Sequence, residues 1–538
     1  MAGNCLYFGD NLGILRDHIG SESVDLIYLD PPFNSNRSYN LLFKESSGDT
    51  ADAQITAFDD TWHWGPSAEQ ALLEVETGPR QDVASVLRAL VDALGRRNDM
   101  TAYLAMMTVR LLELHRVLKP TGSIYLHCDP TASHYLKVVM DAIFGPTSFR
   151  NEVVWKRTGA HSSAKRYGPV HDTVLFFSRS STYTWNPLYS PHPSEYVESH
   201  YSQLDADGRR WMPDNLTAAG VRHGSSGSVW RGFDVTAKGN HWKFTVEHLE
   251  ALDAADMIYW PERGGWPRYK RYLDSVKGIA QQDVWLDVPP INAQAAERLG
   301  YPTQKPLALL ERIIGASSNP GDLVLDPFCG CGTAVCAAQH LGRRWIGIDV
   351  THLAIALVRN RLKGMFGEAL AYDVVGVPQD VASASALAQQ DRSKFEAWAL
   401  SVVEAFPIQG GKKGADSGLD GILTFRDAAS GKPRKAVVQV KSGHVQVGYV
   451  RDLCHVVERE KAAMGFLITL EPPSRPMQTE ALAFGHYHSD GWNRDYQRLQ
   501  IRTVEELLSG KDFDMPPTNV TFEQATRVRQ AAEQGRLL

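Results

Sequence analysis

The sequence predicts an α/β fold built on a doubly wound, mainly parallel sheet. Two apolar runs, residues 26–29 and residues 323–325, each end in an acid and a turn, at Asp30-Pro31-Pro32-Phe33 and at Asp326-Pro327-Phe328. Such a run is typical of a buried strand, and in an open sheet the carboxyl ends of the strands face the ligand. Around both runs, strand patterns alternate with helical patterns, as a doubly wound sheet requires.

The first half of the chain supports this fold element by element. Residues 7–11 predict a strand that runs into a turn, and residues 24–30 predict the next strand. Apolar residues at three- and four-residue spacing predict a helix over residues 100–118, which the Lys-Pro-Thr-Gly segment at 119–122 ends. A strand over residues 123–129 and a helix near residues 133–144 follow, and weaker patterns predict strands at 151–156 and 171–177.

Composition excludes several classes of protein. The 538 residues predict two to four domains, and the six scattered cysteines indicate a reducing compartment. No apolar segment reaches the ~18 residues of a membrane-spanning helix, and the N-terminus has no signal-peptide pattern, so no membrane partner is expected. Cys329 and Cys331 lack a second Cys/His pair, so zinc is not expected. Because the net charge is −6, a DNA-binding surface must be a local basic patch.

The Asp-Pro-Pro-Phe segment suits chemistry on an exocyclic amine of a nucleobase. The lone pair of such an amine is delocalised into the ring, so it needs acceptors that hold its hydrogens and turn the lone pair outward. The carboxylate of Asp30 and the carbonyl of Pro31 are such acceptors, and Pro31 and Pro32 fix their backbone. Phe33 offers a flat face on which an extruded base can stack. An ordinary Asp-Pro turn after a strand is the alternative.

The second acidic motif suits a cofactor with a ribose. Gly330 and Gly332 allow close approach of the backbone to a ligand, and the helix predicted from Thr333 presents free N–H groups to a carboxylate. About twenty residues on, the strand at 345–349 ends in Asp349, whose carboxylate can accept ribose hydroxyls. The motif is not Gly-x-Gly-x-x-Gly, which disfavours a nicotinamide cofactor.

Together these motifs resemble those of S-adenosylmethionine-dependent DNA amino-methyltransferases of the permuted β class, in which the catalytic motif precedes the cofactor motif. The resemblance implies a Rossmann-like methyltransferase sheet, S-adenosylmethionine as cofactor and a prokaryotic cytoplasmic location. Cys331 stands where the family has serine, so some loss of cofactor affinity is expected. The resemblance also implies these cofactor-binding residues: Asp10, Asp30, Thr303, Lys305, Asp326, Phe328, Gly330, Gly332, Thr333 and Asp349.

Two further positions have open interpretations. Asp10 matches the family's acid for the cofactor adenine, but Asp10 or Asn11 also suits the N-cap of the following helix. Residues 127–129, His-Cys-Asp, fall where the family has a strand end near the target-base pocket. We expect His171 to be structural rather than catalytic.

Between residues 178 and 299 the strand–helix alternation is lost, and aromatic and basic residues interleave instead. This mixture suits phosphate contacts and stacking on bases, and the family places its target-recognition region here. The Trp155-Lys156-Arg157 segment and Lys165-Arg166 extend the same basic pattern. Alternatively, the tryptophans form the core of a small irregular subdomain.

In the C-terminal part, a helix over 394–405 precedes a Gly-rich segment, a strand at 422–425 and a strand at 436–442. This pattern resembles the Mrr-type branch of the PD-(D/E)XK nucleases. On the family's pattern, Asp420 and Gln439 are metal ligands for Mg²⁺, and Lys441 positions water or stabilises the transition state. Glu396 or Glu404 adds a carboxylate from the helix. A helix and a β-hairpin need no catalysis to explain them, so a DNA-gripping domain is the alternative.

We therefore expect these segments: 1–178, catalytic half; 179–299, target recognition; 300–376, cofactor half; 377–392, linker; 393–538, nuclease-like domain. The expected function is site-specific methylation of double-stranded DNA, at N6 of adenine rather than N4 of cytosine, in restriction–modification or phage defence. A homodimer and other restriction or defence subunits are possible partners. The rival functions are a Mg²⁺-dependent or bifunctional endonuclease, a catalytically dead DNA-binding protein, and methylation of RNA or protein amides.

Overall fold

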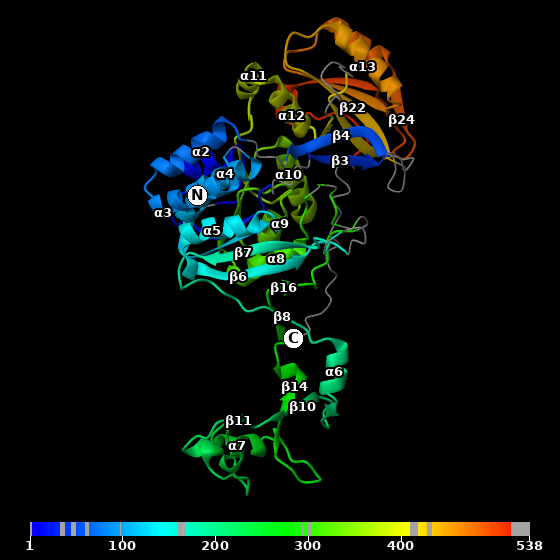
Figure 1. Ribbon diagram of the computed structural model, residues 1–538. Helices are drawn as coiled ribbons and strands as arrows, with labels where there is room; N and C mark the ends of the chain where they lie inside the picture. Colours follow the sequence, from blue (N-terminus) through cyan, green and yellow to red (C-terminus); the bar gives the residue numbers. More distant parts are fainter. Residues whose placement is uncertain are drawn as a thin grey trace. The chain divides into compact units, whose positions relative to one another are not determined.

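The computed structural model describes residues 3–32, 38–44, 50–59, 64–96, 98–159, 165, 167–292, 295, 297–299, 301, 303–408, 418–427 and 433–517 (Figure 1). The side chains of 38–44 and 50–59 are not part of this description, and Phe33 lies outside it. The chain divides into two compact units, residues 187–282 and the remainder, each of which is described by itself. Over the described ranges, no helix has the length and apolar character needed to cross a membrane.

A nine-stranded sheet forms the centre of the larger unit. All neighbouring strands are parallel except at β7, which is antiparallel to both β5 and β6. The predicted mainly parallel sheet is thus confirmed. The strands are, in spatial order, β16 (Val284–Trp285), β6 (Phe149–Lys156), β7 (His171–Ser178), β5 (Leu118–Cys128), β2 (Val24–Leu29), β17 (Leu323–Asp326), β18 (Arg344–Asp349), β1 (Cys5–Phe8) and β19 (Asp373–Val375).

Helices cover both faces of this sheet because its central strands are apolar on both sides. On β2, Ile27 and Leu29 belong to one core, whereas Leu26 and Tyr28 belong to the other. The first core contains α1 (Asn11–His18), α2 (Pro66–Thr77), α3 (Gln81–Leu94), α4 (Asp99–Val117) and α5 (Ser133–Phe144). The second contains α8 (Leu307–Ser317), α9 (Thr333–His340) and α10 (His352–Phe366). A separate hairpin joins β3 (Ser38–Lys44) and β4 (Thr50–Asp59).

The helix ends before residues 119–122, as predicted, but the strand predicted from residue 123 begins earlier. α4 ends at Val117, and β5 begins at once and contains the whole Lys-Pro-Thr-Gly segment. Against β2, Leu118 pairs with Val24 and Ser123 with Leu26, so the segment is a bulge inside the strand. The bulge is held by Lys119, whose amine lies 2.7 Å from Asp25.

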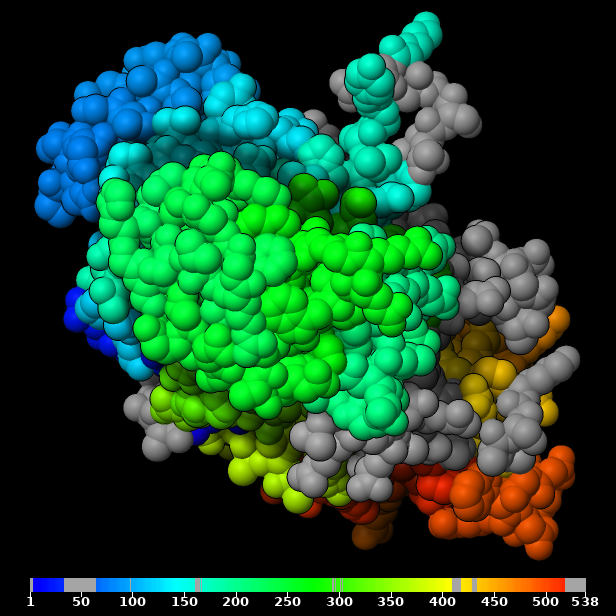
Figure 2. Space-filling view, turned by 90° about the horizontal axis from the view of Figure 1, so that it is seen from below, coloured from blue at the N-terminus to red at the C-terminus, as the bar shows by residue number. Residues whose placement is uncertain are grey.

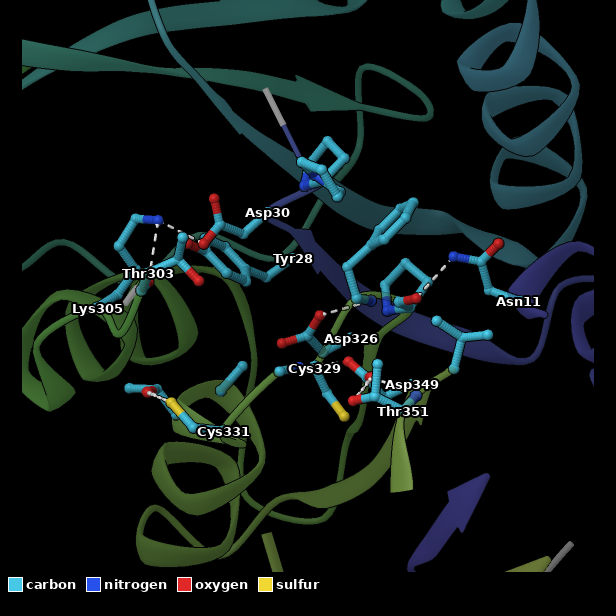
Figure 3. Close-up of a pocket in the computed structure, with 18 of the residues that line it drawn as sticks. Asn11, Tyr28, Asp30, Thr303, Lys305, Asp326, Cys329, Cys331, Asp349 and Thr351 are labelled. Carbon is cyan, nitrogen blue, oxygen red and sulfur yellow. Dashed lines mark hydrogen bonds and ion pairs between the residues drawn. The ribbon is translucent and has the colours of Figure 1, made fainter. Parts of the chain in front are cut away.

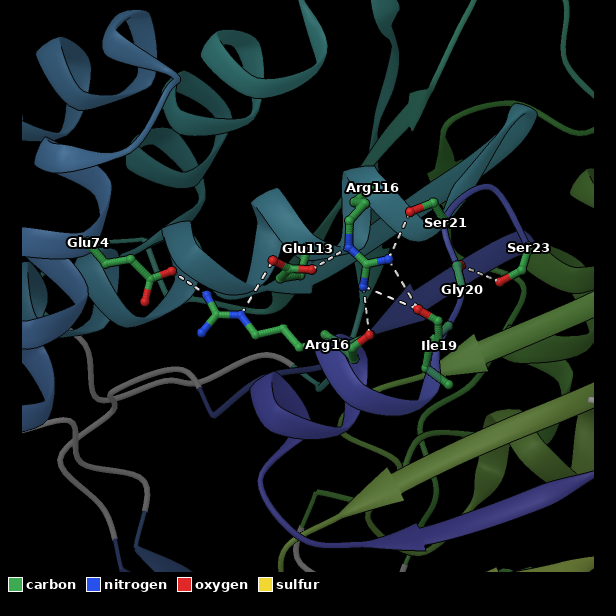
Figure 4. Close-up of polar contacts among 9 residues, drawn as sticks. Arg16, Ile19, Gly20, Ser21, Ser23, Glu74, Glu113 and Arg116 are labelled. Atoms are coloured by element: carbon green, nitrogen blue, oxygen red, sulfur yellow. Dashed lines mark hydrogen bonds and ion pairs between the residues drawn. The ribbon is translucent and has the colours of Figure 1, made fainter.

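Arginine contacts fasten the first helices to one another (Figure 4). Arg116 near the end of α4 donates to the carbonyl of Ile19, 3.2 Å away, and so satisfies a backbone group just past α1. Arg16 on α1 pairs with Glu113 of α4 at 3.4 Å and with Glu74 of α2. The short helix α1, which leads out of β1, is therefore fixed at its far end.

Residues 187–282, drawn in shades of green in Figure 2, form the second unit. A four-stranded antiparallel sheet has the order β13 (Ile258–Tyr259), β14 (Arg268–Tyr272), β10 (Arg210–Asn215), β9 (Gln203–Leu204). Two pairs, β11 (Thr217–Ala219) with β12 (Asn240–Trp242) and β8 (Tyr189–Ser190) with β15 (Ile279–Ala280), and the helices α6 (Ser194–His200) and α7 (Val246–Ala254) complete it. Trp230 and Trp242 are buried in its core.

A five-stranded sheet forms the C-terminal domain of the larger unit. Its order is β20 (Phe406–Pro407), β21 (Gly421–Arg426), β22 (Pro433–Lys441), β23 (Met464–Thr469), β26 (Leu499–Thr503), with the pair β24 (His486–Ser489) and β25 (Arg494–Gln497) beside it. The helices are α11 (Val381–Gln390), α12 (Arg392–Val402), α13 (Val447–Arg459), α14 (Arg475–Ala483) and α15 (Val504–Leu508). The predicted helix at 394–405 and the two predicted strands correspond to α12, β21 and β22.

Gly347 provides a test of the packing of the central sheet. A Cβ at this position on β18 would meet Val335 at 2.9 Å, Leu6 at 3.2 Å and the sulfur of Cys329 at 3.3 Å. We predict that Gly347→Ala lowers the free energy of unfolding by ~1–3 kcal/mol, the usual cost of overpacking a core, as measured by urea denaturation. The control is Gly364→Ala on α10, where nothing lies within 4 Å; it should raise stability by ~0.5–1 kcal/mol. Equal effects of the two substitutions would contradict the packing described.

Candidate active site

A cavity of about 490 Å³ opens at the carboxyl ends of β2, β17 and β18 (Figure 3). It is formed by segments far apart in the chain, because β2 pairs directly with β17 in the nine-stranded sheet. This is the edge at which ligands bind open α/β sheets. The lining residues include Asp10, Tyr28, Asp30, Pro31, Pro32, Arg110, Tyr301, Thr303, Lys305, Asp326, Phe328, Gly330, Cys331, Thr333 and Asp349.

Asp30 and Lys305 join the two halves across the cavity. The amine of Lys305 lies 2.5 Å from Oδ2 of Asp30, although 275 residues separate them, and it also lies 3.4 Å from the carbonyl of Thr303. The side chain of Lys305 is 10% exposed and that of Asp30 is 16% exposed. The pair neutralises one of several acids here and draws the segment before α8 against the end of β2.

Asp349 is held in a fixed orientation at the end of β18. One carboxylate oxygen accepts the N–H of Gly330 at 2.9 Å, and the other accepts both the N–H and the hydroxyl of Thr351 at 2.9 Å. Burial nevertheless raises the pKa of the Asp349 carboxyl above its ordinary value. These three bonds leave the carboxylate with capacity for about one further donor from a ligand.

Asp326 is the more deeply buried acid of the second motif. It accepts the N–H of Phe328 at 3.1 Å. Burial raises the pKa of its carboxyl well above the ordinary value, and the negative charges of Asp30 and Asp349 raise it further. The cavity therefore concentrates acidic groups in a poorly solvated place, which favours a ligand that carries positive charge or hydroxyl donors.

The glycines of the second motif are required by the turn they form. Gly330 and Gly332 have φ angles of 49° and 74°, and the N–H of Gly332 donates to the carbonyl of Cys329 at 2.7 Å. A Cβ on Gly332 would lie 2.7 Å from Val358. The Cys331 sulfur lies 3.7 Å from the hydroxyl of Thr333, and burial raises the pKa of its thiol.

Two arginines of the site were missed by the sequence analysis. Arg110 on α4 pairs with Asp10 at 2.7 Å and donates to Asn11 at 2.6 Å; Asn11 in turn donates to the carbonyl of Pro327 at 2.8 Å. Asp10 occupies the N-cap position of α1, but its side chain makes no capping hydrogen bond and pairs with Arg110 instead. The only local signal for Arg110 was a basic residue on the apolar face of a predicted helix.

Arg361 on α10 is the second arginine that the sequence analysis missed, and its hydrogen bonds fix the glycine turn. It donates to the carbonyl of Cys331 at 3.2 Å and to the hydroxyl of Thr333 at 2.9 Å, and it is 6% exposed. Nothing in the sequence pattern distinguishes it from the other basic residues of its helix, such as the exposed Arg359.

The predicted nuclease residues are only partly brought together. Oδ2 of Asp420 accepts the N–H of Val440 at 2.7 Å, next to Gln439, whose amide donates to the carbonyl of Gly418 at 3.2 Å. The amine of Lys441 lies over the ring of Tyr449. Glu396 lies on α12, and Glu404 follows its end. In the part of the chain that the structure describes, no three His, Cys, Asp or Glu side chains are placed to hold a metal ion.

Many basic residues of unit 187–282 are paired with acids. Arg209 lies 2.8 Å from Asp274, and Lys270 lies 2.9 Å from Asp256. Outside this unit, Arg157 lies 3.1 Å from the buried Asp172. The basic pattern seen in the sequence is therefore partly an internal ion-pair pattern.

Comparison with known proteins gives two matches to protein families. Residues 24–359 match the family described as DNA methylase. The chain belongs to this DNA methylase family. Residues 393–509 match the family described as NACHT-associated inactive Restriction Endonuclease 1.

Individual relatives agree with the larger match. Type II methyltransferase M.EcaI of Enterobacter cloacae is 36% identical over 362 residues, 66% of this chain and 69% of the relative. DNA adenine methyltransferase YhdJ of Escherichia coli K12 is 25% identical over 66% of this chain and 81% of the relative. Among solved structures, a DNA modification methylase of Thermus thermophilus complexed with S-adenosylmethionine is 16% identical, covering 69% of this chain and 100% of that chain, with a TM-score of 0.33.

We predict that Arg361→Met lowers the free energy of unfolding by ~1.5–3 kcal/mol, because the substitution removes charge-assisted bonds to Cys331 and Thr333. Urea denaturation followed by circular dichroism measures the loss. Arg359→Met, an exposed arginine of the same helix, is the matched control and should change stability by less than ~0.5 kcal/mol. A loss no larger than that of the control would exclude the bracing role of Arg361.

Proposed function

We propose that the chain transfers a methyl group from S-adenosylmethionine to an exocyclic amine of double-stranded DNA, at N6 of adenine, as a member of the permuted β class. The observation that carries the proposal is that Asp30-Pro31-Pro32 and the acid-ended β18 open into one cavity. The chain order, with the Asp-Pro-Pro motif before the glycine turn, supports the class. One relative is named a DNA adenine methyltransferase, which supports adenine.

The cavity fits the proposed cofactor. S-adenosylmethionine carries a cationic sulfonium, a ribose and an amino-acid carboxylate, and when bound it supplies an electrophilic methyl group. The acids Asp30 and Asp326 suit the positive charge, and Asp349 has remaining capacity for a ribose hydroxyl. The N-terminus of α9 and the amine of Lys305 suit the carboxylate. Asp10, beside Arg110, remains the candidate for the adenine.

The residues of the first motif would orient the target amine. A base extruded from the duplex costs a few kcal/mol and enters the cavity past Pro31 and Pro32. The Asp30 carboxylate and the Pro31 carbonyl accept the two N–H bonds, which turns the nitrogen lone pair toward the incoming methyl group. Holding both reactants in this geometry supplies ~7–11 kcal/mol of the acceleration. Phe33, which lies outside the described residues, is the proposed stacking surface.

Unit 187–282 is the proposed target-recognition region, within the boundaries 179–299. Its separate core and its basic and aromatic side chains support a role in contacting DNA, although several of the basic side chains are paired with acids. The M.EcaI relative is a type II methyltransferase, which supports a restriction–modification context. A homodimer, further defence subunits and a cytoplasmic location remain part of the proposal.

The C-terminal domain is proposed to bind or regulate without cutting DNA. Its match to an inactive endonuclease family supports this proposal. The hydrogen bond that the Asp420 carboxylate accepts from the N–H of Val440 on β22 also supports it. A Mg²⁺-dependent endonuclease that uses Asp420, Gln439 and Lys441 is the second candidate, supported by the closeness of Asp420 to β22.

We predict that Asp30→Ala lowers the methyl-transfer rate by at least ~10²–10⁴-fold, because the acceptor of the target amine is lost. Binding of S-adenosylmethionine should stay largely intact, because Asp326, Asp349 and the N-terminus of α9 still line the cofactor part of the cavity. The assay is transfer of labelled methyl to mixed-sequence DNA, with nucleosides identified by mass spectrometry and cofactor affinity measured by calorimetry. The control is Asp17→Ala on the exposed face of α1. Near-normal turnover of Asp30→Ala would refute the orienting role, and N4-methylcytosine as product would refute the choice of adenine.

We predict that the full chain leaves DNA uncut when Mg²⁺ is added at about 10 mM, in excess of the usual needs of a Mg²⁺ site. Lys441→Ala should methylate at the wild-type rate. Strand breaks are scored on gels from the same reactions as the label. Breaks that appear with Mg²⁺ and vanish in Lys441→Ala would establish the second candidate instead.

A further inference from the structure

Three buried polar side chains form a continuous hydrogen-bonded chain that begins at the wall of the cavity. Tyr28 on β2 lines the cavity, beside Asp30 in Figure 3, and its hydroxyl lies 3.0 Å from Nδ1 of His127 on β5. Nε2 of His127 lies 3.1 Å from Oδ2 of Asp172 on β7. All three side chains are at most 2% exposed. Polar groups so deep in a sheet are costly unless they are paired, and here they are paired in series.

The direction of this chain follows from the charge of Asp172. Burial alone would raise the pKa of Asp172, but its hydrogen bond to His127 and the positive charges of Lys305 and Arg157 lower it. Asp172 is therefore ionised and can only accept, so Nε2 of His127 carries the hydrogen. When the imidazole is neutral, Nδ1 is an acceptor and the Tyr28 hydroxyl donates to it.

In this direction the Tyr28 oxygen donates one bond to Nδ1 and keeps acceptor capacity, on a side chain that lines the cavity. On the proposed function, on which this inference rests, the amine nitrogen holds one proton too many after it has been methylated. Asp30 already accepts a bond from Lys305 at 2.5 Å, and it has to hold an N–H of the amine as well. The imidazole of His127 is a base that the described hydrogen bonds connect to the cavity through Tyr28.

We propose that Tyr28, His127 and Asp172 form a proton relay for the methylated amine. The proton moves from the amine nitrogen to the Tyr28 oxygen while the hydrogen of Tyr28 moves to Nδ1 of His127. The electron pair of the broken N–H bond stays on nitrogen, the methylamino product is neutral, and His127 becomes an imidazolium beside the Asp172 carboxylate. After the product has left, the proton returns from His127 through Tyr28 to water in the cavity, and His127 is neutral again.

The two transfers must occur together, because Tyr28 does not form a phenolate on its own. Burial raises the pKa of Tyr28 well above its ordinary value, and the charges of Asp30, Asp326 and Asp172 raise it further. Arg157, 3.1 Å from Oδ1 of Asp172, keeps that carboxylate ionised and is a positioning residue.

Substitutions that preserve shape test the relay. Tyr28→Phe removes the hydroxyl. Asp172→Asn provides an amide that can donate to Nε2 of His127, which reverses the direction of the hydrogen bonds from Asp172 to Tyr28. Each should lower the single-turnover rate by ~10²–10⁴-fold, with little change in affinity for S-adenosylmethionine or DNA. The double variant should be no slower than the slower single variant, because the residues act as one unit. Tyr125→Phe is the control: Tyr125 is equally buried, but its hydroxyl bonds Ser317 at 2.6 Å and does not line the cavity.

A second readout needs no turnover. Nitrogen-15 NMR of histidine-labelled full chain reports which ring nitrogen carries the hydrogen, and His127→Gln identifies the signal of His127. The relay requires Nε2–H in the wild type and Nδ1–H in Asp172→Asn. Wild-type Nδ1–H overturns the relay, whether or not the protein methylates DNA.

The outcomes separate the two proposals. If the wild type transfers label but Tyr28→Phe and Asp172→Asn do so at its rate, the relay is wrong and the proposed function stands. If the wild type transfers no label to any DNA, the proposed function fails, and the proposed catalytic role of Tyr28, His127 and Asp172 fails with it.

Discussion

The parallel pairing of β2 with β17 is the constraint on which the site depends. Leu26 pairs with Val324 and Ile27 with Leu325, which joins strands from opposite ends of the methyltransferase-like domain. Because the strands are parallel, their carboxyl ends meet at the same edge, and Asp30 and Asp326 necessarily face one cavity. Apolar residues on both faces of β2 make a slip of register costly, since it would move core side chains to the wrong helical layer.

The cavity contains buried carboxylates whose removal from water is unfavourable, and a ligand can compensate this cost. Asp326 and Asp349 are buried acids with raised pKa values, and Lys305 pairs with Asp30 rather than with either of them. Removing such groups from water is unfavourable unless they are compensated, so a cationic ligand with hydroxyl donors gains more here than in an apolar pocket. The fixed orientation of Asp349 by Gly330 and Thr351 means that little reorganisation is needed when the ligand binds.

The sequence predicted features that are local in the chain. The strands that end in Asp30, Asp326 and Asp349, the glycine turn, and the helices predicted at 100–118, 133–144 and 394–405 follow from apolar periodicity and turn residues within a few positions. The early start of β5, with its bulge at 119–122, was missed because helix-ending residues are also suited to a bulge, and only the pairing of Leu118 with Val24 reveals the strand. Long-range contacts were beyond sequence reasoning, since no periodicity connects Arg110 with Asp10, Lys305 with Asp30, or His127 with Asp172. The pairing of Arg209 with Asp274 likewise shows why a basic-aromatic pattern overstates a DNA-binding surface: acids elsewhere in the unit neutralise part of it.

The central claim is that the two halves of the domain build one ligand cavity. Hydrogen–deuterium exchange of the full chain with and without S-adenosylhomocysteine tests it most directly. The account predicts slowed exchange in peptides that cover residues 24–32, 303–310, 326–333 and 344–351 together. Protection confined to residues 326–351, with the Asp30 segment unchanged, would contradict a shared cavity.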